Sequence, residues 1–384
     1  MELMELRTIE NNESINMWGY SELTPNFRHK ETLKHNISCI YGICNSFDTF
    51  ISPKDNQSYI LFSNKTDLSS VNIYIYSTSK KDIYKKLTPS VHLKELRLLK
   101  YFTNKTKKRE YIISADCEGI LCIWIYNSNS NNFVLQNKIN AYNQNDIFNC
   151  ILLFKNDINF NIDDDYIVFA CESISDDETT CAKVYSLNKG NFIKNIVATN
   201  KEKIRNILMW HNEKNNENYL ICLATDKIIF INFIKNIKEK EITTKEKNTF
   251  NCGIIFNEII DNDEKSYLCC TSSTGHILVF DLEEGNITCD ILLKPFTHRV
   301  YDILPWNDKY IIIADCLDNG FLIFEYKSGG KIIGISNITG LDEDDIECIR
   351  KINHPEYGEC VVTASHKNLI KIYECISKNL NFNL

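Results

Sequence analysis

The sequence has no long apolar run, and its first residues lack the basic and apolar regions of a secretory signal. The opening MELMELRTIENNES contains no apolar core, and such a core is what defines a signal peptide. No segment approaches the roughly 18 consecutive apolar residues that a membrane-spanning helix needs. We therefore expect an intracellular, cytoplasmic protein with no membrane association.

Motifs for catalysis and for cofactor binding are also missing. The thirteen glycines form no phosphate-binding loop and no Gly-x-Gly-x-x-Gly turn, and no Gly-x-Ser-x-Gly motif occurs. The sixteen cysteines include no Cys-x-x-Cys pair, which argues against a zinc ribbon. Cysteines such as Cys122 and Cys222 lie inside apolar runs instead, as reduced core residues do. We expect no catalytic residue, no cofactor and no metal.

The charge balance is acidic, with 43 lysines and arginines against 51 aspartates and glutamates. Non-specific nucleic-acid binding needs a basic surface that displaces counterions, so we expect no nucleic-acid partner. One acidic cluster, SDDETT at 175–180, lengthens a turn between two apolar runs. We expect solvated loop acids there; the alternative is a docking loop for a partner, formed by Asp176, Asp177 and Glu178.

What the chain does contain is a repeated pattern of short runs rich in Ile, Val, Tyr and Phe, separated by turns of Asn, Asp, Gly and Lys. This pattern is typical of β-strands and turns. The runs group into seven units about 46 to 57 residues apart, which open at Ile37, Leu93, Ile147, Ile204, Phe250, Val300 and Ile346. A second run follows in each unit and begins with tyrosine in six of the seven. A third run ends in an aromatic residue, and most units have a weaker fourth run.

Four strands in each of seven units predict an all-β fold, a seven-bladed β-propeller over residues 37–384. Residues 1–36 form an N-terminal segment. Because the first strand of many propellers completes the last blade, we expect residues near Leu3–Ile9 to close the propeller by pairing there. The stretch from Asn16 to Lys34 has no predicted structure.

The second unit carries the most recognisable copy of the repeat. Ser114 stands near the end of its second run, Gly119 lies in the turn, and Trp124 stands in its third run. This arrangement resembles the WD-repeat (WD40) family, in which a Ser or Thr, a turn Asp and a Trp-Asp pair recur. The stretch from Val300 to Glu374 in particular resembles the last blades of divergent WD-repeat proteins of protists. Other units match the pattern more loosely, at Phe280, Asp318, Phe324 and Tyr373.

The resemblance implies structural roles for these residues. Trp124 is expected to be the aromatic of the third strand, packed between neighbouring sheets. The Gly-His pair that opens most such repeats is nearly absent, with only His35 and His298 as candidates. The family's His–Asp–Ser–Trp hydrogen-bond network is therefore expected to be mostly missing.

The resemblance also implies a function, a non-enzymatic scaffold that binds other proteins of unknown identity within a larger intracellular assembly. One alternative is a reader of a modified peptide at the channel mouth, which needs an aromatic or acidic cage. A more remote alternative is a propeller hydrolase.

Overall fold

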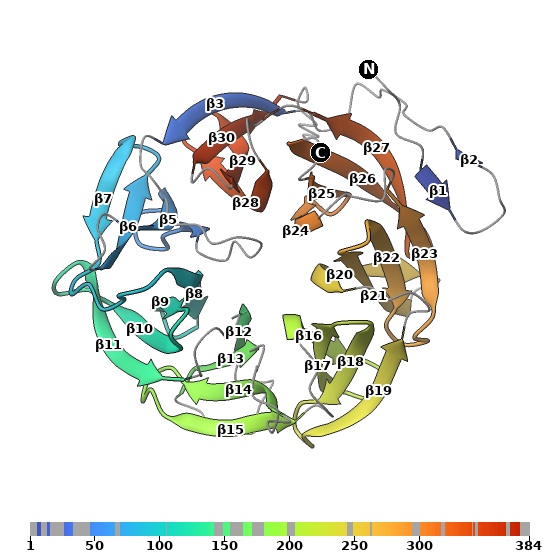
Figure 1. Ribbon diagram of the computed structural model, residues 1–384, viewed down its shortest axis with the longest axis horizontal. Helices are drawn as coiled ribbons and strands as arrows, with labels where there is room; N and C mark the ends of the chain where they lie inside the picture. The colour runs from blue at the N-terminus through green and yellow to red at the C-terminus, as the bar shows by residue number, and fades with distance from the viewer. Residues whose placement is uncertain are drawn as a thin grey trace. The chain divides into compact units, whose positions relative to one another are not determined.

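Every regular element in the described part of this computed structural model is a β-strand (Figure 1). None of the described residues forms a helix long and apolar enough to cross a membrane. The structure describes residues 6–8, 14–15, 27–33, 47–65, 70–104, 106–141, 149–153, 164–170, 180–197, 204–243, 249–261, 263–293, 300–315, 319–339, 341, 345–365 and 369–376.

The chain divides into two compact units, one of which spans His35–Lys247. It contains four sheets of four antiparallel strands each. The first sheet consists of β4 (Phe47–Ile51), β5 (Ser58–Lys65), β6 (Val71–Ser77) and β7 (Asp82–Lys86). The second consists of β8 (Leu96–Asn104), β9 (Arg109–Asp116), β10 (Ile120–Asn127) and β11 (Asn132–Asn140). The third consists of β12 (Asn149–Leu153), β13 (Tyr166–Ala170), β14 (Thr180–Ser186) and β15 (Phe192–Val197). The fourth consists of β16 (Ile204–Asn212), β17 (Glu217–Ala224), β18 (Lys227–Asn232) and β19 (Ile237–Thr243).

The other unit joins Met1–Lys34 to Asn248–Leu384 and contains three sheets. The fifth sheet consists of β20 (Phe250–Ile260), β21 (Asp263–Ser272), β22 (His276–Asp281) and β23 (Ile287–Leu292), extended by β1 (Leu6–Thr8) and β2 (Ser14–Ile15). The sixth consists of β24 (Val300–Trp306), β25 (Tyr310–Asp315), β26 (Gly320–Lys327) and β27 (Lys331–Ile338). The seventh consists of β28 (Ile346–His354), β29 (Gly358–Ser365), β30 (Ile370–Cys375) and β3 (Phe27–Leu33).

The second and third strands of each sheet have buried residues on both of their faces. In β9, for example, every residue from Glu110 to Asp116 is buried. The apolar side chains gather in clusters that join neighbouring sheets: first with second, second with third, and third with fourth in one unit. In the other unit they join fifth with sixth and sixth with seventh. Near-continuous apolar runs are what strands buried on both faces require.

The pairing of the third and fourth strands is interrupted at the same place in every sheet. The outer strand has one extra residue there, which is a β-bulge. In six sheets the interruption falls beside an aromatic residue of the third strand. In the fourth sheet it falls between Phe230 and Ile231 of the third strand. The residues on the third strand are Tyr76, Trp124, Tyr185, Ile231, Phe280, Phe324 and Tyr373.

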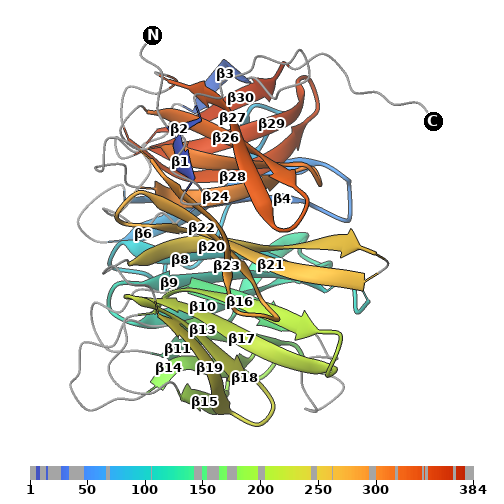
Figure 2. The ribbon, with the colours of Figure 1, turned by 90° about the vertical axis from the view of Figure 1, so that its right-hand side faces the viewer.

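Two strands of the fifth sheet extend past their neighbours as a hairpin (Figure 2). β20 and β21 pair as far as Ile260 and Asp263, whereas β22 pairs with β21 only from Tyr267 onward. Glu258 on this hairpin accepts a hydrogen bond of 2.9 Å from the backbone N–H of Gly329, in the β26–β27 turn. The hairpin therefore links the fifth sheet to the sixth.

The N-terminal segment joins two sheets, but not as the sequence predicted. β1 pairs with β23 of the fifth sheet, through Arg7 and Thr8. The strand that adds to the seventh sheet is β3, which pairs with β30 along its whole length. The expectation that Leu3–Ile9 completes the last sheet was therefore wrong. The first sheet likewise starts with β4 at Phe47, and the predicted opening at Ile37 lies outside the described residues.

β3 is held by its two ends, because Phe27 and Leu33 are buried while the residues between them are exposed or half-buried. The Phe27 ring makes edge-to-face contacts with Trp306 and Phe321, at centroid distances of 5.3 and 5.4 Å. Such aromatic pairs add to the stabilisation that burial gives. Phe27 thus anchors the N-terminal strand in the core shared by the sixth and seventh sheets.

We predict that Phe27→Ala lowers the free energy of unfolding by about 3 to 5 kcal/mol, since it empties a filled aromatic site. Chemical denaturation followed by tryptophan fluorescence measures this change. Arg28→Ala is the matched control, because the Arg28 side chain is 60% exposed and forms an ion pair with Glu374 at the surface. The control should cost under about 1 kcal/mol. Equal losses in the two variants would contradict the anchoring role of Phe27.

Candidate functional site

Four buried side chains form a hydrogen-bonded network in the second sheet. Trp124 Nε1 donates to Ser114 Oγ at 3.0 Å. His92 Nε2 lies 2.8 Å from the same oxygen, and His92 Nδ1 lies 2.8 Å from Asp116 Oδ2. One tautomer satisfies every group: Nδ1 donates to the carboxylate, and Nε2 accepts from the Ser114 hydroxyl, which in turn accepts from Trp124. The other oxygen of Asp116 accepts from the backbone N–H groups of Glu118 and Ile120, which fixes the β9–β10 turn.

The histidine of this network was not among the candidates predicted from the sequence. The candidates, His35 and His298, lie outside the described residues, whereas His92 comes from the segment between β7 and β8. The backbone of His92 also bridges to Val71 of the first sheet, through a Val71 N–H to His92 C=O bond of 2.9 Å. The network therefore holds together one turn of the second sheet and one contact between the first two sheets.

The other predicted repeat positions hold the same places without this network. Phe280, Phe324 and Tyr373 lie on the third strands of the fifth, sixth and seventh sheets, and all are fully buried. By strand register the counterparts of Ser114 are Cys270, Ile313 and Thr363. Ile313 has no polar side-chain atom, and the Cys270 thiol is only a weak hydrogen-bonding group. The buried Thr363 hydroxyl has no hydrogen-bond partner within the described structure. Asp318 and the candidate loop residues Asp176, Asp177 and Glu178 lie outside the described residues.

We predict that His92→Ala lowers the free energy of unfolding by about 3 to 5 kcal/mol, because it leaves the buried Asp116 carboxylate without its partner. Urea denaturation of the full chain measures the loss. His29→Ala, in the exposed part of β3, serves as the control and should change stability by less than about 1 kcal/mol. An unchanged unfolding midpoint for His92→Ala would show that the network does not stabilise the fold.

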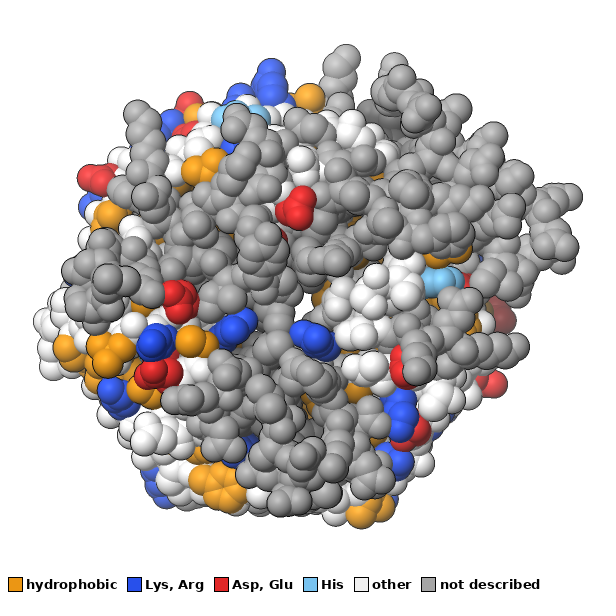
Figure 3. All heavy atoms as spheres, in the orientation of Figure 1, with side chains coloured by type: hydrophobic (Ala, Val, Ile, Leu, Met, Phe, Trp, Pro, Cys, Tyr) orange, Lys and Arg blue, Asp and Glu red, His pale blue; other side chains and the backbone are white. Residues whose placement is uncertain are grey.

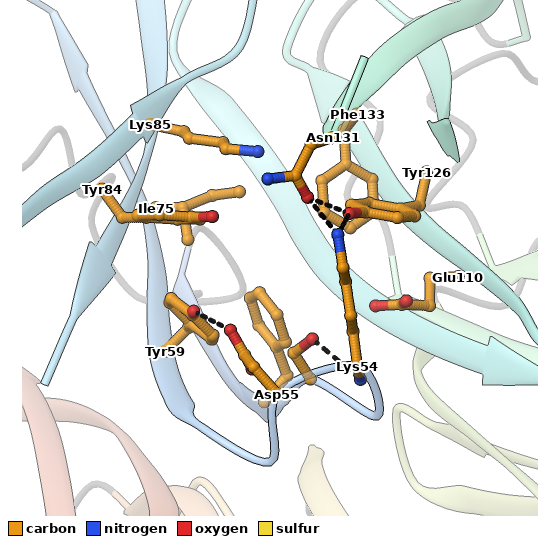
Figure 4. A pocket seen from close by; sticks show the side chains of 12 residues that line it. Lys54, Asp55, Tyr59, Ile75, Tyr84, Lys85, Glu110, Tyr126, Asn131 and Phe133 are labelled. Atoms are coloured by element: carbon orange, nitrogen blue, oxygen red, sulfur yellow. Dashed lines mark hydrogen bonds between the residues drawn. The ribbon is translucent and has the colours of Figure 1, made fainter. Parts of the chain in front are cut away.

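A hollow of about 130 Å³ lies between the first and second sheets, on the side of the first-to-second and third-to-fourth strand turns (Figure 4). Its first-sheet wall comes from β4, the β4–β5 turn, β5, β6 and β7. Its second-sheet wall comes from β9, β10, the β10–β11 turn and β11. The walls are largely aromatic, with Tyr59, Tyr84, Tyr126 and Phe133 among the lining residues.

Backbone geometry places the polar groups of the hollow. Asp55 caps its own turn by accepting from the Gln57 N–H, and the turn closes with Asn56 at a φ of 53°. Asn131 holds the β10–β11 turn in the same left-handed conformation, which asparagine tolerates better than most residues. Lys54 Nζ donates to Asn131 Oδ1 at 2.5 Å and to the Tyr126 hydroxyl at 3.0 Å. Turns of both sheets are thereby tied together by one lysine.

The β-bulge of the first sheet supplies the opposite wall. Ile75 pairs with Lys85 and Tyr76 with Ile83, so that Tyr84 is the extra residue of β7. Lys85 Nζ lies 4.9 Å from the centre of the Tyr84 ring. Burial, and then the nearby Lys54 ammonium, lower the pKa of Lys85. Two ammonium groups thus face the same small space.

Two carboxyl groups also line the hollow, and each is engaged by a tyrosine. Tyr59 OH donates to Asp55 at 2.6 Å, and Tyr101 OH donates to Glu110 at 2.8 Å. Burial raises the pKa of Glu110, and the Tyr101 hydrogen bond opposes this only in part; the Asp55 charge raises it further and Lys54 lowers it. The neutral form of Glu110 is therefore favoured by folding.

The raised pKa of Glu110 predicts a pH-dependent effect of Glu110→Gln. A folded-state pKa above the ordinary 4.5 means that this residue stabilises the fold at low pH and that the contribution is lost as pH rises through the folded pKa. Glutamine keeps the neutral form at all pH values, so the variant should be more stable than the wild type at pH 7 and equal to it below pH 4. Melting temperatures across this range measure the difference. A variant less stable at pH 7 would contradict the assigned cause.

The described surface has mixed charge, and basic and acidic side chains are interspersed on the face that Figure 3 shows. No group of three or more His, Cys, Asp or Glu side chains within the described ranges could hold a metal ion. The described cysteines carry free thiols, and burial raises the pKa of Cys122 to about 12.

Comparisons with known proteins give similarity of structure but not of sequence. No family model matches the chain, and no curated protein matches it. A crystal structure of BBS1N in complex with ARL6DN, soaked with lead, is similar with a TM-score of 0.61 at 10% identity, over 92% of this chain and 98% of that one. The same complex soaked with mercury gives a TM-score of 0.59 at 8% identity, over 91% and 96% of the two chains. The fold is a seven-bladed β-propeller. This confirms the fold class predicted from the sevenfold spacing of the runs.

Proposed function

We propose that this protein is a non-enzymatic interaction scaffold of the WD-repeat class, and that it acts as a subunit of a larger intracellular assembly. The observation that carries the proposal is the hollow between the first and second sheets. Its tyrosines and charged side chains come from strands and turns of a scaffold whose middle strands have buried residues on both faces. Aromatic residues in preformed recesses are what protein partners use as anchoring points.

Two further observations support the proposal. The network of His92, Asp116, Ser114 and Trp124 contains the four residue types that the resemblance to WD repeats implies, in one blade. The similar solved chain, BBS1N, is seen in complex with ARL6DN, so a propeller of this length can serve to bind another protein. The coverage of both chains is nearly complete, which makes the comparison one between whole propellers.

The alternative of a peptide reader is supported by the aromatic lining of the same hollow. Tyr59, Tyr84 and Tyr126 resemble the walls of a cage. The hollow lies among the first-to-second and third-to-fourth strand turns of the first and second sheets. In this alternative the bound group is a peptide side chain, and the scaffold and reader functions use one surface.

We predict that the full chain, captured from cells that express it natively, has a native mass well above its own 44.7 kDa. Native mass spectrometry of the captured material gives the mass and the stoichiometry of each co-purifying protein. The control is the His92→Ala variant, in which the amount of captured partner should fall only in proportion to the amount of folded protein. A monomer without partners would contradict the scaffold function, and a stoichiometric metal in that monomer would favour a propeller hydrolase.

A further inference from the structure

The two lysines of the hollow differ in how they are engaged. Lys54 Nζ is bound by Asn131 and Tyr126. Lys85 Nζ rests on the Tyr84 ring, and no carboxylate within the described structure lies at ion-pair distance from it. Figure 4 shows both ammonium groups directed toward the space beside Asn131. A half-buried ammonium without an anionic partner favours the binding of one.

The acidic residues of the hollow do not serve as that partner. Asp55 is occupied by the Tyr59 hydroxyl and by the Gln57 backbone N–H. Glu110 is occupied by Tyr101 and lies on the far side of Lys54 in Figure 4. The charge that is missing from the hollow is therefore negative, and it is missing on the Lys85 side.

The donors around this space suit an oxyanion. Asn131 presents its carbonyl oxygen to Lys54 and Tyr126, which leaves its amide nitrogen on the side toward Lys85 (Figure 4). Two ammonium groups and one amide N–H₂ can thus converge on one group, and charge-assisted hydrogen bonds of this kind are the strong ones. The hollow of about 130 Å³ is smaller than typical small-molecule pockets of about 300 Å³ or more, so it suits one side chain.

We propose that this hollow binds the carboxylate or phosphate of a partner protein's side chain between Lys54 and Lys85, with the Asn131 amide as a third donor. The aromatic rings of Tyr84 and Phe133 form the walls against which the rest of that side chain packs. The inference rests on the proposed scaffold function and specifies the chemistry of its partner, an acidic or phosphorylated segment. A cationic side chain is disfavoured because it would meet the two lysines already present.

The test uses the full chain with its lysines reductively methylated with ¹³C-formaldehyde, which keeps their charge and makes each one visible by NMR. Three acetylated and amidated pentapeptides are titrated, identical except for glutamate, phosphoserine or glutamine at the centre. The Lys54 and Lys85 signals are assigned by their loss in Lys54→Gln and Lys85→Gln. We expect the glutamate peptide or the phosphoserine peptide to shift both lysine signals to saturation. The peptide that binds more tightly shows whether the hollow prefers a carboxylate or a phosphate. The glutamine peptide should shift neither.

Lys86→Gln is the matched control, since Lys86 follows Lys85 on β7 but lies over the Tyr74 ring, outside the lining of the hollow. Lys54→Gln and Lys85→Gln should each weaken binding by roughly tenfold or more, while Lys86→Gln should leave it unchanged. Equal binding of the glutamine peptide, no saturation with any peptide, or equal weakening by Lys86→Gln would each overturn the proposal.

The same variants separate this proposal from the scaffold function. If the wild type captures partners in cells but the peptides do not bind the hollow, the scaffold function stands and the anion site is wrong. If the peptides bind as expected but no partner is captured, the site stands and the scaffold function is wrong.

Discussion

Burial of the middle strands on both faces is the constraint on which the rest of this structure depends. In β9 the side chain of Ile112 packs in the core shared with the first sheet, while Ile113 packs in the core shared with the third. In β10 the neighbouring residues Trp124 and Ile123 divide in the same way. A single sheet therefore cannot bury its own apolar residues, and each needs a neighbour to be stable. Polar groups inside such strands must find partners within the protein, as Ser114 does.

The same constraint explains what could be predicted from the sequence. Strands buried on both faces leave unbroken apolar runs, so the second and third strands of all seven sheets were found, including β9 and β21, whose apolar runs begin at Tyr111 and Tyr267. The outer strand of each sheet is half exposed, so its apolar pattern in the sequence is weak. β3 has no apolar run, because all five residues between Phe27 and Leu33 are polar or charged, whereas the short MELRTIE segment has apolar residues at Met4, Leu6 and Ile9. The sequence therefore favoured the wrong partner for the seventh sheet.

Side-chain networks and turns were predicted less well, because they depend on contacts between distant residues. His92 follows no glycine and lies in an irregular segment, so only its position next to Asp116 and Ser114 reveals its role. The asparagines near the ends of the first strands differ in conformation. Asn307 does take a left-handed conformation with a φ of 52°. Asn257 does not, because β20 continues past it into the long hairpin. The hollow and its lysines could not be recognised in the sequence, since the residues that line the hollow come from two different units of the repeat.

The recurrent β-bulge shows how a structural constraint can leave room for function. The extra residue appears in the outer strand of every sheet, and in six of the seven it lies beside an aromatic of the third strand that is buried. Its identity is free, because the outer strand faces solvent on one side. In the second sheet the extra residue is Gln136, which donates to the backbone of Asn188, and in the seventh it is Lys30, which pairs with Glu374. In the first sheet it is Tyr84, which turns its ring into the hollow beside Lys85. At such a position the packing determines where the residue lies, while the type of side chain can vary. A scaffold can acquire a binding site there without loss of stability.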